Sequence, residues 1–165
     1  MLQKCRKVLR NEKGLTLIEL LAVVVILGII AAIAIPSIGG LIDNSKKDAH
    51  VANAQQMASS ARLAITGEPK FQEGTWYVSL KYLQDENYIE DLKDPDNGTY
   101  TEGTSTTIVS TIAELGTGAS YVKVVSGKPD SVYLINTKPR GVRTGTGDTL
   151  TDPVSLDSLT RDSVK

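Results

Sequence analysis

The side chain with the most distinctive chemistry in this 165-residue chain is Glu19, a lone carboxylate at the start of an apolar run. Residues 20–35 are uncharged, and all are apolar apart from Gly28. A carboxylate inside such a segment costs about 3 kcal/mol if the segment enters a membrane, so the default interpretation is that it has a function. A positive group at close range is the partner that would offset this cost.

The other reactive side chains do not form a catalytic set. His50 is the single histidine and Cys5 the single cysteine, so no histidine pair and no intrachain disulfide can form. The sequence also has no glycine-rich phosphate loop. We therefore expect that the protein is not an enzyme, and we interpret His50 as a solvated or rim side chain.

A short acidic stretch supplies weak candidates for a metal site. Asp94, Asp96 and Asn97 offer hard oxygen ligands, of which calcium takes about six to eight. Their spacing does not match an EF-hand, because Gly98 stands where a third ligand would be needed. A solvated turn is the favoured interpretation, and no cofactor is expected.

Glu19 lies in a segment long enough to cross a bilayer. Residues 15–35 would cover roughly 30 Å as a helix, close to the thickness of the hydrocarbon core. Residues 1–14 carry a net charge of +4, which is typical of a cytoplasmic flank. The rest of the chain carries a net charge of −5, which argues against direct binding of nucleic acid.

Three interpretations of this N-terminal region compete. A secretory signal peptide would end at a small-residue cleavage site, and Ala32-Ile33-Ala34 fits that pattern. An ordinary single-pass anchor is the second interpretation. Neither a signal peptide nor an anchor explains the carboxylate of Glu19. Cleavage before the apolar segment is the third, and it explains the glycine at position 14 together with the carboxylate.

The third interpretation is supported by a resemblance to a known family. Residues 14–21, Gly-Leu-Thr-Leu-Ile-Glu-Leu-Leu, followed by the apolar run resemble the N-terminus of type IV pilins and pseudopilins. Gly28 and Pro36 also fall where that family often has a glycine and a proline. The resemblance implies cleavage between Gly14 and Leu15 by a prepilin peptidase, followed by N-methylation of Leu15.

The sequence departs from the family pattern at two points. Leu15 replaces the phenylalanine that is commonest at the first mature position. A second proline, about twenty residues after Pro36, is missing, and Gly39-Gly40 offers flexibility instead. We expect the long helix to bend at Pro36, Gly39 and Gly40.

The resemblance also implies a mode of assembly. Glu19 of an incoming subunit would pair with the Leu15 amine of its neighbour in a helical homopolymer, although pairing within its own chain is the alternative. The implied partners are the prepilin peptidase, an assembly ATPase and a platform membrane protein. The implied location is the cytoplasmic membrane before assembly and a surface or extracellular filament afterwards.

The rest of the chain predicts an α+β fold of the pilin kind. Residues 1–14 form a leader, 15–36 a membrane or filament-core helix, and 37–66 its amphipathic continuation, with a stripe at Val51, Ala54, Ala58, Ala61 and Ile65. Residues 67–165 form a globular head with a helix near 80–86, capped by Ser79. Strands are expected at 106–113, 119–125 and 131–137, in a small antiparallel sheet that packs on the long helix. Pro153 suggests a short C-terminal helix.

The predicted function is that of a structural subunit of a type IV pilus or a similar filament. A major pseudopilin of a competence (DNA-uptake) or type II secretion system is the nearest alternative. The segment that ends Asp-Pro-Asp-Asn-Gly-Thr-Tyr at Tyr100 is similar to one in major pseudopilins and Gram-positive pilins. A secreted or anchored binding domain that never polymerises is the more distant alternative.

Overall fold

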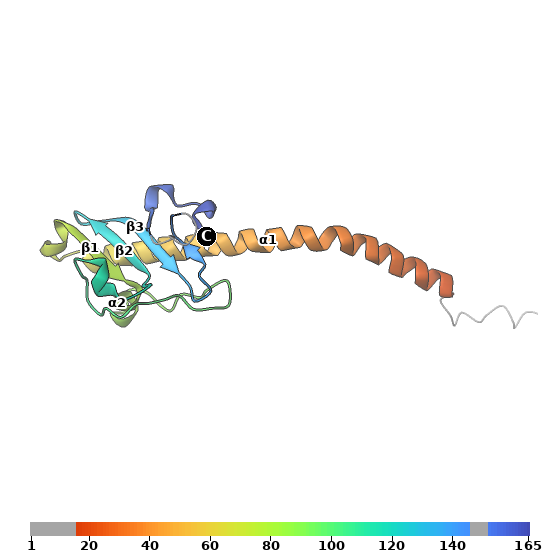
Figure 1. Cartoon of the computed structure of the whole chain (residues 1–165), viewed down its shortest axis with the longest axis horizontal. Coiled ribbons are helices and arrows are strands. Elements are labelled where there is room, and N and C mark those ends of the chain that lie inside the picture. Colours follow the sequence, from red (N-terminus) through yellow and green to blue (C-terminus); the bar gives the residue numbers. More distant parts are fainter. Residues whose placement is uncertain (1–15, 146–151) are drawn as a thin grey trace, which may run out of the picture. The chain divides into compact units, whose positions relative to one another are not determined.

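A computed structural model describes residues 16–145 and 152–165, and these divide into two compact units between Ile42 and Asp43. A single helix, α1 (Leu17–Ile65), contributes to both units (Figure 1). The predicted processing residues Gly14 and Leu15 lie outside the described residues.

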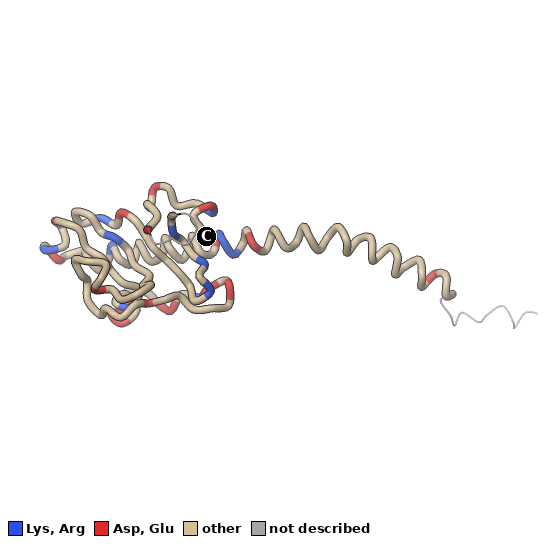
Figure 2. The backbone as a smooth tube through the Cα atoms, in the orientation of Figure 1, with Lys and Arg blue, Asp and Glu red and all other residues tan. Residues whose placement is uncertain are grey.

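The part of α1 in the first unit is apolar and almost entirely exposed. Leu17, Ile33 and Ile35 are 85%, 72% and 70% exposed, and the side chains between them are similarly uncovered. After the acidic position near its start, Figure 2 shows no charge on this part of the helix. α1 is also the helix, among the described residues, that is long and apolar enough to cross a membrane. Its surface therefore needs either lipid or another protein to cover it.

The helix is assigned without a break through Pro36. A proline inside a helix removes one backbone hydrogen bond, and the two glycines that follow add little helical preference. The expected bend at Pro36, Gly39 and Gly40 stays a prediction.

The part of α1 in the second unit is amphipathic. Its buried positions include Ala54, Met57, Ala61 and Ile65, which recur at three- and four-residue steps. Gln55 and Arg62 are exposed between these buried positions. This pattern follows the apolar stripe expected from the sequence.

The head contains a five-stranded sheet whose pairings are all antiparallel (Figure 1). The strands are β1 (Thr75–Ser79), β2 (Tyr121–Val125), β3 (Lys128–Ile135), β4 (Gly141–Val142) and β5 (Val154–Ser155). Their order is β1-β2-β3-β4, and β5 pairs with β3. The predicted strands 119–125 and 131–137 correspond to β2 and β3.

The main core lies between the sheet and α1. Val78, Val122, Val124, Val132 and Leu134 of the sheet are fully buried in one cluster with the buried side chains of α1. Each such side chain contributes about 1.5–3 kcal/mol of burial relative to exposure. The head is thus an α+β unit with its sheet packed on the second part of α1.

The predicted strand at 106–113 is wrong. Only Val109 forms a bridge there, to Tyr77 of β1, and a 3-10 helix (Ile112–Leu115) follows. Gly103 and Gly116, which lie outside this segment, adopt positive φ angles, so the chain turns before and after it. Val109 and Leu115 are instead buried in a second cluster with Tyr121 and Tyr133.

Two further elements differ from the sequence-based expectation. Residues 75–79, where the sequence analysis predicts no strand, form β1 because they pair along their whole length with β2. The C-terminal segment forms β5 and two 3-10 turns (Leu156–Ser158 and Arg161–Ser163) where a short helix was expected. Val154 pairs with Val132, and Val164 with Val142, so the strand contacts outweigh the local helical signal.

The short helix α2 (Leu80–Asp85) forms as expected. The backbone N–H of Tyr82 donates to Ser79 Oγ at 3.0 Å, which is the predicted N-cap. The loop that follows α2 leads to the acidic residues 94 and 96.

Candidate functional site

The first candidate site is the start of α1, where Glu19 contacts Thr16. Glu19 Oε2 accepts the Thr16 backbone N–H at 2.8 Å and the Thr16 hydroxyl at 2.9 Å. Thr16 precedes the first helical residue, and Glu19 stands three positions after it, which is the capping-box arrangement. The carboxylate is therefore hydrogen-bonded to the first turn of its own helix.

This arrangement leaves the carboxylate able to bind a further cation. Both hydrogen bonds end on the same oxygen, Oε2, and the Glu19 side chain is exposed. The partner predicted for it is the Leu15 amine, and Leu15 lies outside the described residues. The assembly roles of Glu19 and Leu15 stay predictions.

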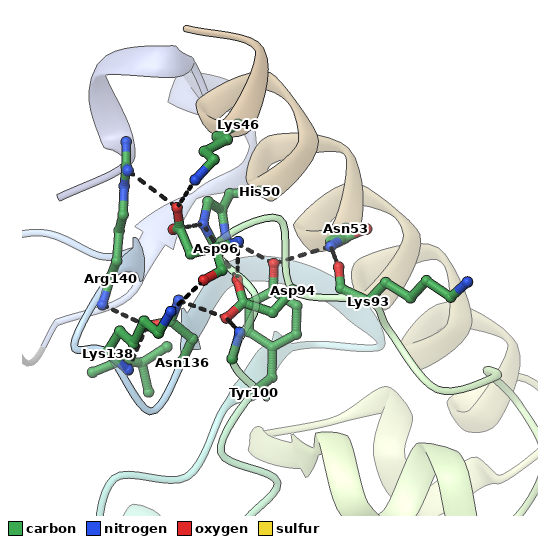
Figure 3. Close-up of polar contacts among 12 residues, drawn as sticks. Lys46, His50, Asn53, Lys93, Asp94, Asp96, Tyr100, Asn136, Lys138 and Arg140 are labelled. Carbon is green, nitrogen blue, oxygen red and sulfur yellow. Dashed lines mark hydrogen bonds and ion pairs between the residues drawn. The ribbon is translucent and has the colours of Figure 1, made fainter. Parts of the chain in front are cut away.

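The second candidate site is a buried polar cluster around His50 (Figure 3). The His50 side chain is fully buried, with Nδ1 2.7 Å from the Tyr100 hydroxyl and Nε2 2.9 Å from Asp96 Oδ2. Asp94 Oδ1 lies 3.8 Å from the same Nε2. The expectation that His50 is a solvated or rim side chain is wrong.

The hydrogen bonds around His50 fix which ring nitrogen carries the proton. Asn53 Nδ2 donates to the Lys93 carbonyl and to the Tyr100 hydroxyl oxygen, both at 3.0 Å. The Tyr100 proton must then point to His50 Nδ1, which accepts it. His50 consequently carries its own proton on Nε2 and donates it to Asp96, as assigned from this chain of donors and acceptors.

Asp94 organises the turn on which this cluster is built. Its carboxylate accepts the backbone N–H groups of Asp96 at 3.0 Å and Gly98 at 2.9 Å. It also accepts Asn136 Nδ2 at 2.9 Å, from the end of β3. A Cβ at position 98 would meet Asp94 Oδ2 at 2.6 Å, so a glycine is needed there.

Asp96 connects the cluster to charged groups closer to the surface. Its Oδ1 contacts Lys46 Nζ at 3.2 Å and Arg140 Nη1 at 3.3 Å. Arg140 Nη2 continues to Asp43 Oδ1 at 2.6 Å. This set joins α1 to the 93–100 loop and the end of β3, and we call it the polar clamp. It consists of the buried His50, Asp94, Tyr100 and Asn136 and the half-buried Asn53 and Asp96.

The pKa shifts in this cluster are those expected of ionisable groups that pair with one another. Burial raises the pKa of the Asp96 carboxyl, but hydrogen bonds from His50 and Lys46 and the charge of Arg140 outweigh this, so its pKa is lowered overall. The Arg140 hydrogen bond lowers the pKa of Asp43. Burial raises the pKa of Tyr100, which keeps the proton that the His50 contact requires.

Only two of the three calcium candidates come together. The ligand atoms of Asp94, Asp96 and His50 lie within 4.8 Å of one another, whereas Asn97 is exposed and donates its backbone N–H to the Asp94 carbonyl. An imidazole that holds a proton on the inward-facing nitrogen and two neighbouring cations do not fit a hard divalent ion. The geometry favours a network of protein charges over a cation site.

The position of His50 could have been read from the sequence. It precedes Ala54, Met57 and Ala61 at steps of four, three and four, so it lies on the buried stripe of α1. The carboxylates that partner it come from a distant loop, which helical spacing does not identify.

Comparison with known proteins gives the family. Residues 9–35 match the family described as "Prokaryotic N-terminal methylation motif". The chain is also 33% identical over 129 residues to a "Fimbrial protein" of Pseudomonas aeruginosa, across 78% of this chain and 70% of that protein. No solved structure matches the chain significantly. The chain belongs to the type IV pilin family and is a pilin-like structural subunit.

Proposed function

We propose that the protein is the structural subunit of a type IV pilus. A prepilin peptidase cleaves between Gly14 and Leu15 and methylates the new amine, and the subunits polymerise through α1. The observation that carries this proposal is the exposed apolar surface of residues 17–42, which nothing in the described chain covers. The similarity to a protein named "Fimbrial protein" favours a pilus over a pseudopilus.

Assembly exchanges one apolar environment for another. Before assembly, residues 17–42 lie in the membrane, and in the filament they pack against the same segments of neighbouring subunits. Lipid tails are about as apolar as leucine side chains, so this exchange supplies little hydrophobic free energy. The direction of assembly must then come from specific contacts and from an assembly ATPase that acts through a platform membrane protein.

Glu19 is the specific contact on the subunit side. In the free subunit its carboxylate is held by Thr16, which reduces the cost of placing it in the membrane. In the filament it pairs with the methylated Leu15 amine of a neighbour, where low dielectric strengthens the attraction. The pairing sets the register between adjacent subunits.

The test compares Glu19→Ala with Glu19→Gln in cells that carry the assembly machinery. Glutamine also completes a capping box, so it keeps the Thr16 contact and removes only the charge. We expect both variants to be processed and inserted in the membrane, but sheared filaments to fall at least about tenfold, since an ion pair in low dielectric is lost. Normal filaments from Glu19→Gln would contradict the register-setting role.

Mass spectrometry of the mature N-terminus tests the class of protein independently. A chain that starts at Leu15 and is about 14 mass units heavier supports processing and N-methylation. A chain that starts at Ile35 would instead support a secretory signal and a domain that does not polymerise. This measurement does not depend on whether filaments form.

A further inference from the structure

A cavity of about 460 Å³ lies over one face of the sheet in the head. Alternate residues of a strand point to opposite faces of its sheet, and Val122 and Val132 belong to the main core against α1. Their direct neighbours Tyr121 and Tyr133 therefore point to the other face, where they line the cavity. All the described residues that line it belong to the head. Its volume falls in the range of about 300–1,000 Å³ that is usual for small-ligand sites.

Two tyrosine hydroxyls contribute polar groups to the cavity. Tyr121 and Tyr133 are 3% and 6% exposed, and their stacked rings have centroids 5.4 Å apart. Tyr77 packs against Tyr121 at 5.7 Å, so the three rings largely cover one another. Neither the Tyr121 nor the Tyr133 hydroxyl forms a hydrogen bond within the described part of the chain, and neither oxygen is sealed from solvent. Buried tyrosine hydroxyls usually have a partner, so these two are available to a ligand.

Asp152 supplies the one charge among the described residues that line the cavity. Its side chain is exposed, and the ion pairs between described residues all use other carboxylates. Burial is the main cause that raises the pKa of Tyr121 to about 12, and the charge of Asp152 adds to it after the neighbouring tyrosines. Lys123 shares this face of β2 but is not among the described lining residues. The polar groups of the cavity therefore form a negative, hydrogen-bond-accepting end.

The 3-10 helix Ile112–Leu115 gives the cavity an apolar wall. Ile112, Ala113 and Leu115 all line it, and Ile112 is 48% exposed. Within the described part of the head, the large aliphatic side chains that are exposed are Ile112 and Leu63. A ligand with an apolar body would remove the Ile112 side chain from water, which is favourable by about 25 cal/mol per Å² of apolar surface.

We infer that this cavity binds a small organic cation, with its ammonium group at the Asp152 carboxylate and the two tyrosine hydroxyls and its apolar body against Ile112. An ammonium group has three donors and no acceptor, which matches a carboxylate and two phenolic oxygens. Hydrogen bonds between charged groups are also roughly twice as strong as neutral ones. The carboxylate would repel an anion, and a purely apolar ligand would leave all three polar groups without partners. The inference does not depend on processing or polymerisation, because the described lining residues all belong to the head.

The test measures binding of 2-phenylethylammonium to the full, ¹⁵N-labelled chain in nonionic detergent micelles. Two ligands of similar shape control for partition into the micelle: the neutral 2-phenylethanol and the anionic 3-phenylpropanoate. We expect the amine to shift the amide signals of Gly116, Gly118 and Ala119 with a Kd of about 1 mM or tighter, which is within reach of a ligand of about nine non-hydrogen atoms. The alcohol should bind at least about tenfold more weakly, and the anion should cause no saturable shift.

Substitutions at the polar end test which groups bind the amine. Asp152→Asn should weaken binding about tenfold or more, whereas Asp157→Asn, at an exposed carboxylate that does not line the cavity, should leave it unchanged. Tyr133→Phe keeps the ring and removes one hydroxyl, so we expect binding to weaken about threefold to tenfold. Tyr88→Phe, at an exposed ring elsewhere on the head, is its control.

Substitutions at the apolar wall test the other half of the site. Ile112→Ala should weaken binding of the amine and the alcohol by the same factor, and Leu63→Ala, at the other exposed aliphatic side chain, should change neither. Equal affinity for amine and alcohol, or unchanged binding of the amine by Asp152→Asn, would overturn the inference. Shifts confined to residues 17–42 would do the same, because they indicate partition into the micelle. The ligand series needs no substitution, so it decides the inference even where a variant fails to fold.

Discussion

The charged groups in the two parts of α1 have different kinds of hydrogen-bond partner. In residues 17–42 the single carboxylate, Glu19, is exposed and hydrogen-bonded only to Thr16 of its own helix start. In residues 43–65 the charged and polar groups are tied to distant segments, and His50 is fully buried among them. One site is completed within a single helical turn, and the other needs the whole head to be folded.

This difference assigns separate tasks to the two parts. A carboxylate satisfied by its own turn can exchange partners without disturbing the fold, which suits an assembly contact. A buried network with every partner supplied by the chain cannot lose one member cheaply. We therefore expect changes at the start of α1 to affect assembly, and changes in the polar clamp to affect stability.

The largest effect is expected for Asp94→Ala. The substitution leaves two backbone N–H groups and the Asn136 amide without an acceptor. We expect the free energy of unfolding of the head to fall by about 3–5 kcal/mol, measured by urea titration in detergent micelles. Asp130→Ala, at an exposed position of β3, is the matched control and should change it by less than about 0.5 kcal/mol. If Asp94→Ala lowered the free energy of unfolding no more than the control does, the expected role of the polar clamp in stability would be wrong.

Tyr100→Phe should have the next largest effect. It removes the proton donated to His50 Nδ1 and the acceptor used by Asn53. We expect a loss of about 1–3 kcal/mol in the same titration, because one buried acceptor and one donor are left unpaired. Tyr88→Phe at an exposed ring serves as the control. Equal stability of the two variants would show that the Tyr100 hydroxyl contributes nothing through its contacts with His50 and Asn53.

Alkaline pH should destabilise the head and leave residues 17–42 of α1 unchanged. Burial raises the pKa of Tyr121 to about 12, against about 10 in the unfolded chain. The stability this tyrosine contributes is therefore fully present below pH 10 and is lost as the pH rises from 10 toward 12. We expect the Tm of the head to fall in that window, and Tyr121→Phe to reduce the fall. Residues 17–42 contain no tyrosine, so their helical circular dichroism should stay unchanged.

Thr16→Val probes the start of α1 with a smaller effect. The hydroxyl that contacts Glu19 is lost, while size and apolar character are kept. We expect amide exchange in the first turn of the helix to speed up by about fivefold, corresponding to about 1 kcal/mol of capping. Unfolding of the head should not change. A slower head unfolding transition or a lower Tm would show that the two parts are coupled.

The smallest effect is expected for calcium. Because Lys46, Arg140 and the His50 proton already face the clamp carboxylates, adding 1 mM calcium or a chelator should leave the Tm of the head unchanged. An increase of several degrees with calcium would instead reveal a cation site at Asp94 and Asp96. Asp94→Asn would then be expected to abolish that increase.

The elements that the sequence predicted well are those set by local chemistry. The apolar length of α1, its amphipathic stripe and the Ser79 cap all depend on neighbours within a few residues. The valine-rich composition of β2 and β3 likewise predicted strands. The Thr16 contact also had a local signature, since threonine followed three positions later by glutamate is typical of a helix start.

The features that were missed depend on partners far along the chain. β1 is a strand because β2 lies beside it, whereas the 106–113 segment makes only the isolated bridge from Val109 to Tyr77. The helical stripe places His50 on the buried face of α1, but its carboxylate partners come from more than forty positions later, with a sequence separation of 46 to Asp96. Neither periodicity nor composition carries that information.

The closing contacts of the head have a consequence for the timing of synthesis and export. Arg161 is bonded to Asp48 across 113 positions, and Lys165 exchanges backbone hydrogen bonds with Gly141. The head cannot complete its fold until residue 165 has left the ribosome, and such distant pairings form slowly. The head therefore stays open until the end of synthesis, which would favour export before folding.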